Sequence, residues 1–206
     1  MCTINGAGRQ GERTSNTKWR INGLIYAELL PDSTIMKNVE SYDSVTLVVC
    51  PICANTSVGY QKNLPAFKRS IDKATGEITF VRSAITGEAY RIKDLLDEKD
   101  KDVKVEMYGA PCVMAMDKEL PRNVKGGDAD IKLFEQCANT DVVLALCCSV
   151  GMLGLKRRFG GSTRIVPGMK TIGISQFSFK FDETKELVYV DRENSTVISS
   201  FQPRSD

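Results

Sequence analysis

Two cysteines, Cys50 and Cys53, form the motif of this chain that is most typical of a metal site. Their CxxC spacing would let two thiolates bind one zinc ion, and a complete site would need further cysteines or carboxylates because the chain contains no histidine. Cys147 and Cys148 are adjacent rather than spaced as CxxC, and we expect them to be buried as small apolar residues. A redox CxxC belongs at the start of a helix, whereas residues 55–59 have the composition of a loop. We therefore predict no cofactor, with zinc at Cys50 and Cys53 as a weak alternative.

The absence of histidine also limits the catalytic chemistry of the chain. It excludes Ser-His-Asp and Cys-His nucleophile pairs, the HExxH zinc proteases and histidine proton shuttles. No pair of carboxylates with glycosidase character stands out from the background. We therefore predict a protein without enzymatic activity.

A second candidate site is the glycine-containing segment 159–163, which basic residues flank on both sides. Residues 142–181 contain six basic residues and no acidic one. Exposed backbone amides, a hydroxyl and guanidinium groups suit phosphate binding, and Phe159 could stack on a base or enter a lipid interface. The segment is not a Walker A motif, and the alternative is a solvated loop whose cations complement a helix C-terminus. The predicted anion-binding residues are Lys156, Arg157, Arg158, Phe159, Arg164 and Lys170.

Two other segments, 94–106 and 182–193, contain more acidic than basic residues. One basic and two acidic surfaces on a protein of net charge +2 favour head-to-tail self-association, in which opposite charges meet. The alternative for each acidic segment is an ordinary solvated helix or turn.

The elements that would position these residues begin after a polar segment. Residues 1–18 are rich in Gly, Ser, Thr, Asn and Arg and predict a flexible basic arm. The patterns then predict a strand over 19–30, a short helix from Ser33 or Thr34 to about Tyr42, and a buried strand over 45–50.

The middle of the chain is expected to alternate between helices and strands. Pro65 is suited to the first turn of a helix that would end before Gly76. The following elements are predicted as a strand over 78–85, a turn at 86–87, a return strand over 89–92, a short helix within 93–104 and a strand over 103–107.

Residues 142–155 carry no charge, and a run of this length predicts a buried core helix rather than a membrane span. An amphipathic helix is expected around 131–137. The C-terminal third alternates: we predict a strand over 171–181 with a bulge near Ser175, a hairpin loop at 182–185, and strands over 187–190 and 196–201.

Length and composition agree with one α+β domain. The chain has 206 residues, of which 42% are hydrophobic and 26% charged, as in ordinary globular proteins. The predicted organisation is a flexible arm over 1–18 and a single domain over 19–206, with a mainly antiparallel sheet packed on one or two helices. Seven cysteines, an odd number, and an N-terminus without a signal-peptide pattern favour an intracellular location or a virion interior over secretion.

In general character the chain resembles small viral structural proteins, in particular the matrix proteins of enveloped RNA viruses. The likeness lies in the basic arm, the α+β body and the segregated charge; PPxY and PTAP-like budding motifs are absent. It implies a structural protein that self-associates and binds an anionic partner: a nucleoprotein, RNA or an acidic membrane surface. The alternative is an RNA-binding viral coat, movement or silencing-suppressor protein, and a zinc-stabilised regulatory module is a third hypothesis.

Overall fold

The computed structural model describes residues 19–72, 74–109, 111–112 and 135–199. It confirms a mixed α and β fold in which the larger sheet is antiparallel. The structure also contains a second, smaller sheet whose strands are all parallel, which the sequence patterns did not predict. The arm over 1–18 and most of the helix expected around 131–137 lie outside the described residues.

The antiparallel sheet curls on itself. Its strand order is β1-β8-β9-β3-β4, and β10 pairs with β8 beside this path. Although β1 and β4 are the two ends of the order, the rings of Trp19 and Phe80 meet edge to face with centroids 5.4 Å apart. The strands span Trp19–Leu29 (β1), Pro65–Ile71 (β3), Ile78–Arg82 (β4), Met169–Asp182 (β8), Leu187–Val190 (β9) and Thr196–Ser199 (β10).

The parallel sheet has the order β5-β2-β6-β7. After β2, the next strand of this sheet along the chain is β5, which lies on one side of β2. After β6, the next strand is β7, which lies on the opposite side of β6. The direction in which strands are added therefore reverses between β2 and β6. Such a reversal is where α/β sheets commonly place a site, outside the carboxyl ends of the strands. The strands span Ser44–Val49 (β2), Asp102–Met107 (β5), Val142–Leu146 (β6) and Arg164–Pro167 (β7).

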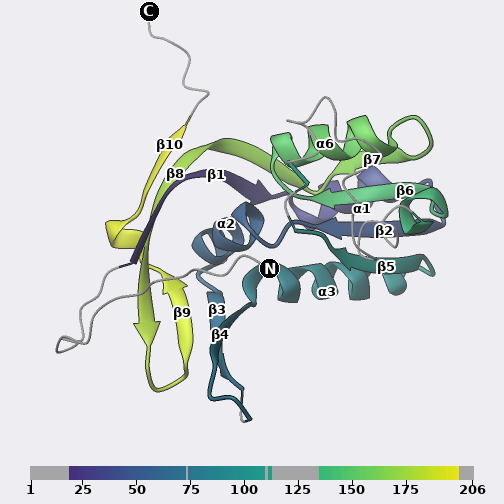
Figure 1. The fold of residues 1–206 in the computed structure, drawn as a ribbon. Coiled ribbons are helices and arrows are strands. Elements are labelled where there is room, and N and C mark those ends of the chain that lie inside the picture. The colour runs from purple at the N-terminus through teal and green to yellow at the C-terminus, as the bar shows by residue number, and fades with distance from the viewer. Residues whose placement is uncertain (1–18, 73, 110, 113–134, 200–206) are drawn as a thin grey trace, which may run out of the picture.

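Helices connect and cover the two sheets. The helix α2 packs against β1, β3 and β9 of the curled sheet and against α3. Figure 1 shows α6 beside β7 at one end of the parallel sheet and α3 beside β5 at the other end. The helices span Asp32–Val39 (α1), Cys53–Lys62 (α2), Ala84–Asp97 (α3) and Ser149–Phe159 (α6), and a short 3₁₀ helix, η1, spans Arg192–Asn194.

Two hydrophobic cores correspond to the two sheets. The larger surrounds the parallel sheet, in which every residue from Val142 to Leu146 is buried. The smaller lies on the curled sheet and includes Tyr26, Phe177 and Phe179. Polar side chains of α2 join the layers: the Asn55 amide donates to the Ala66 carbonyl over 2.7 Å.

The strands predicted over 19–30, 45–50, 103–107, 171–181 and 187–190 are confirmed within one or two residues at most ends. The predicted helix over 142–155 is wrong: the segment divides into β6 and the first part of α6. A central parallel strand is buried on both faces and therefore reads as a continuous apolar run, which periodicity does not distinguish from a buried helix.

Two further predictions between residues 65 and 97 are wrong. The helix expected from Pro65 is the strand β3, in which proline takes the first position, where strands tolerate it. The turn and return strand expected over 86–92 belong to α3, whose buried Ile85, Ala89, Ile92 and Leu96 follow the helical period.

Smaller differences concern where elements begin. The helix expected from Ser33 or Thr34 starts at Asp32, without a side-chain cap, and ends at Val39. The register of β1 and β8 shifts opposite Ser175, as predicted, but the extra residue is Gly23 on β1, whose φ of +77° suits glycine.

Candidate functional site

The predicted basic residues lie mainly at the C-terminal end of α6 and on β7. Lys156, Arg157 and Arg158 are exposed in the last turn of α6. Arg164 is exposed at the first position of β7, the edge strand of the parallel sheet. We call these four residues the basic end. Cations in this position complement the partial negative charge of the helix C-terminus.

The loop between α6 and β7 does not offer its backbone to an anion as the sequence suggested. The amides of Gly160, Ser162 and Thr163 donate to carbonyls of the last helical turn, Lys156 or Phe159, over 2.9 Å. The Ser162 hydroxyl also donates to the Phe159 carbonyl, over 3.0 Å. These three amides are therefore not available to an anion, which makes the charged side chains the main groups that could bind one.

The structure corrects the role predicted for Phe159. Its side chain is 3% exposed and belongs to the larger hydrophobic core. A ring in this position does not reach a base or a lipid interface, because it anchors the end of α6. Its sequence position, four residues after Leu155, is consistent with the core-facing stripe of a helix.

Lys170 is exposed but separated from the basic end. It lies on β8, opposite Glu28 of β1 in the antiparallel register. Because β7 runs from Arg164 to Pro167, Lys170 lies beyond the carboxyl end of that strand, whereas the basic end lies at the amino end. The structure thus brings together four of the six predicted residues.

The acidic segment 94–106 lies at the opposite side of the parallel sheet. It follows the C-terminal part of α3 into β5, the other edge strand. Asp94, Glu98 and Asp100 are exposed and form no ion pair with another described residue, whereas Lys93 pairs with Asp97. We call Asp94, Glu98 and Asp100 the acidic end. Carboxylates at a helix C-terminus are disfavoured by the helix dipole, so α3 alone gives no reason for this charge.

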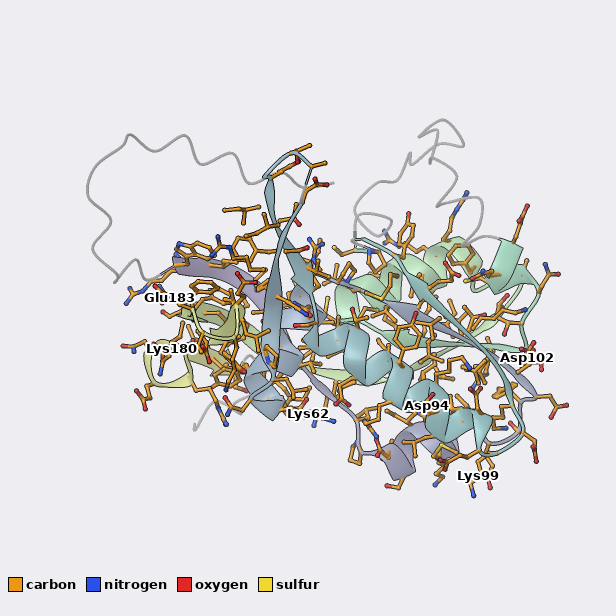
Figure 2. All side chains as sticks on the ribbon, turned by 90° about the horizontal axis from the view of Figure 1, so that it is seen from below. Lys62, Asp94, Lys99, Asp102, Lys180 and Glu183 are labelled. Carbon is orange, nitrogen blue, oxygen red and sulfur yellow. The ribbon has the colours of Figure 1, made fainter. Side chains whose placement is uncertain are left out.

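The second acidic segment, 182–193, lies far from the first. Figure 2 shows Lys180 and Glu183 at one side of the molecule, and Asp94 and Asp102 at the other. A cavity of about 530 Å³ lies here, partly lined by Lys180, whose ammonium nitrogen is 3.0 Å from an Asp191 carboxylate oxygen and 3.8 Å from one of Glu193. The lining contains two cations, Lys180 and Arg192, and two carboxylates, Asp182 and Glu193, so the cavity presents no dominant charge to a ligand.

The CxxC motif lies at the reversal of strand order in the parallel sheet. Cys50 follows β2 directly, and Cys53 is the first residue of α2. The expectation of a loop over 55–59 is wrong, since these residues are buried in α2. The motif therefore lies between a strand and a helix, contrary to the prediction from the sequence.

Cys147 and Cys148 lie beside this motif. The Cys50 amide donates to the Leu146 carbonyl over 3.1 Å, which extends the parallel register of β2 and β6 by one step and puts Cys50 opposite Cys147. Cys148 is the N-cap of α6. Sequence reasoning missed this neighbourhood because it took 142–155 as one helix; a strand ending at Leu146 would have indicated it.

These thiols are largely buried. Cys50, Cys147 and Cys148 are at most 4% exposed, whereas Cys53 is partly exposed. Burial raises the pKa of Cys53 to about 11, against the opposing effect of a backbone hydrogen bond from Ile25. Burial also raises the pKa of Cys147 well above its usual value. At neutral pH both groups are thiols rather than thiolates.

Within the described residues, no group of three or more cysteine or carboxylate side chains is placed to hold a metal ion. The six cysteines of this part of the chain are in the reduced, thiol form. Of the helices that the structure describes, none is long and apolar enough to cross a membrane.

Comparison of the chain with protein-family models, with curated proteins and with solved structures gave no match.

Proposed function

We propose that the chain is a non-enzymatic assembly protein of matrix-like type, which self-associates head to tail and binds an anionic partner through the basic end. We assign both self-association and the binding of the anionic partner to the four residues of the basic end: Lys156, Arg157, Arg158 and Arg164. The anionic partner is a nucleoprotein, RNA or an acidic membrane surface.

The observation that supports this proposal is the separation of charge across the parallel sheet. The basic end lies beside β7 and the acidic end beside β5, which are the two edge strands. Three strand spacings of about 4.8 Å put these edges about 14 Å apart, before their side chains and helices are added. Opposite charges on opposite sides favour contacts in which one copy's basic end meets the next copy's acidic end.

Such a contact is heterologous, because the two surfaces that meet are different. Repetition of a heterologous contact produces a ring where the rotation closes and a filament where it does not. The exposed charges of Asp94, Glu98 and Asp100 act against the dipole of α3 in a lone molecule, and a cationic partner would relieve this cost.

Sedimentation velocity at low and moderate salt tests the assembly. We expect the wild type to form oligomers at low salt and to dissociate as screening increases. The Lys156→Glu variant should assemble about tenfold more weakly, since it replaces attraction by repulsion across the contact, a difference of about 1.4 kcal/mol. Lys68→Glu is the matched control: it reverses one exposed lysine on β3, remote from both ends. Monomeric wild type at every salt concentration would reject self-association.

RNA binding is the second candidate function. The basic end presents exposed side-chain cations rather than backbone donors, and such cations suit the phosphate groups of RNA whatever its base sequence. Binding to single-stranded RNA and to anionic liposomes should be compared over a range of salt concentrations. Steep salt dependence on RNA together with no liposome binding would favour the RNA-binding alternative.

A further inference from the structure

The five cysteines at the carboxyl end of the parallel sheet are not used by the proposed function. They come from three turns: after β2, after β5 and after β6. The turn after β5 contributes Cys112, which is partly exposed. The basic end lies at the opposite, amino edge of the same sheet, so the thiols belong to a separate region.

Two cross-turn pairs follow from the topology. Cys50 and Cys147 continue the register of neighbouring parallel strands, and their side chains therefore point to the same face. Cys53, the first residue of α2, lies three residues after Cys50, and Cys148, the N-cap of α6, lies one residue after Cys147. Cys148, Cys50 and Cys112 each contribute to raising the pKa of Cys53, which agrees with a shared neighbourhood.

The close packing of this region reinforces the arrangement. Gly151 of α6 leaves no room for a side chain: a Cβ there would lie 3.0 Å from the Cys147 sulfur and 3.1 Å from a Pro111 carbon. The first turn of α6, the end of β6 and the turn after β5 thus meet at this glycine.

We propose that this region is an oxidation site, in which a reversible disulfide between Cys53 and Cys148 joins the β2–α2 turn to the β6–α6 turn. Of the four thiols in these turns, Cys53 is the partly exposed one and reacts first, while Cys148 is buried beside it and resolves the product.

The oxidant is a peroxide. Because the pKa of Cys53 is raised, it reacts through the small fraction that has lost its proton. This thiolate attacks one peroxide oxygen, the O–O bond breaks, and the hydroxide that leaves takes up the proton, which gives a sulfenic acid and one water. The Cys148 sulfur then attacks the Cys53 sulfur, the S–O bond breaks, and a second water leaves. In total, two thiols and one hydrogen peroxide give one disulfide and two waters, and a dithiol reductant reverses the change.

Peptide mapping of the whole chain tests this assignment. Trypsin should release residues 38–62, which contain Cys50 and Cys53, and residues 133–156, which contain three cysteines. After native protein is treated with hydrogen peroxide and alkylated, we expect these two peptides joined, at a mass two hydrogens below their sum. Cys137→Ser removes the third cysteine of the second peptide and should leave the link unchanged.

Single variants identify the pair. Cys53→Ser and Cys148→Ser should each abolish the link, and serine suits the N-cap position that Cys148 occupies. Cys112→Ser should retain the link. Thermal melts of each reduced variant show whether it is folded, and oxidised wild type should melt several degrees higher than reduced wild type, because the link closes a long loop.

A link within one turn, a link between Cys50 and Cys147, a link between two molecules, or no link in folded protein would each overturn the assignment. Reduced and oxidised protein should also be compared by sedimentation. If neither form assembled, that result would contradict the proposed function and would leave the assignment of the disulfide unchanged.

Discussion

At the scale of single residues, Asp141 illustrates how one side chain fixes a strand. It precedes β6, and one of its carboxylate oxygens accepts the Ser44 amide over 2.9 Å, the Ser44 hydroxyl over 2.9 Å and the Asp43 amide over 3.2 Å. The Asp141 amide in turn donates to the Ser44 hydroxyl over 2.9 Å. These bonds align the amino ends of β2 and β6 and thereby set the register that later brings Cys50 opposite Cys147.

We expect Asp141→Ala to lower the melting temperature at neutral pH. Hydrogen bonds from Ser44, chiefly from its amide, hold the pKa of Asp141 below its ordinary value of 3.8. A lowered pKa in the folded state means that the ionised carboxylate stabilises the fold above about pH 4 and that this contribution disappears as the pH falls through the lowered pKa. Wild type and variant should therefore differ most near neutral pH and converge in acid.

Melting curves between about pH 2 and pH 7 measure this difference. Asp43→Ala is the matched control, because it removes a neighbouring carboxylate and keeps the backbone amide that Asp141 accepts. A difference between wild type and Asp141→Ala that stays constant over the whole pH range would contradict the assignment.

At the scale of elements, the sequence predicted strands well where they alternate or are β-branched. Val45 to Val49 and Leu187 to Val190 were recognisable because their residues favour strands and turn residues bound them. The segment 142–155 was misread because burial on both faces removes the period that separates a strand from a helix. Pro65 was misread because proline suits the first position of a helix and of a strand equally, and only pairing with β9 and β4 decides between them.

Two glycine substitutions test how elements are held. A Cβ on Gly173 of β8 would lie 1.9 Å from the Ile198 carbonyl oxygen of β10, so Gly173→Ala forces the two backbones apart. We expect a loss of about 1–3 kcal/mol in the free energy of unfolding, as in overpacked sites. Hydrogen exchange should show faster exchange of the β10 amides, while the parallel sheet stays protected.

Gly87 provides the opposite case. It is exposed within α3 and a Cβ there meets no atom within 4 Å. Gly87→Ala should stabilise the protein by about 0.5–1 kcal/mol, since alanine loses less backbone entropy in a helix. Equal effects of the two substitutions in denaturant unfolding would contradict the packing described at Gly173.

At the scale of the whole molecule, the candidate sites depend on which segments the fold brings together. The basic end was predictable because Lys156 to Arg158 are adjacent in the sequence and Arg164 follows after one loop. The relation of Cys50 to Cys147 was not, because it arises from pairing between strands almost a hundred residues apart. Local sequence patterns therefore predict the charge of a surface, whereas long-range strand pairing determines which residues become neighbours in the sheet.

The position of the basic and acidic ends on opposite edge strands leads to a prediction about mixtures. Lys156→Gln with Arg164→Gln neutralises two cations of the basic end and keeps the acidic end. Asp94→Asn with Glu98→Gln neutralises two carboxylates of the acidic end and keeps the basic end. Because a heterologous contact needs one end of each kind, neither variant should self-associate at low salt, whereas an equimolar mixture should form one-to-one dimers and stop there.

The mixture discriminates between head-to-tail assembly and a two-fold symmetric contact. In a two-fold symmetric contact, the same surface of both molecules meets. Each variant would then associate with itself as readily as with the other variant, and the mixture would form no dimer of its own. Sedimentation of each variant alone and of the mixture, with the ratio of the two chains measured by mass spectrometry, distinguishes these cases. Assembly of either variant alone to the wild-type extent would contradict the assignment of charge to the contact, and a dimer that persists unchanged at about 1 M salt would argue against an electrostatic interface.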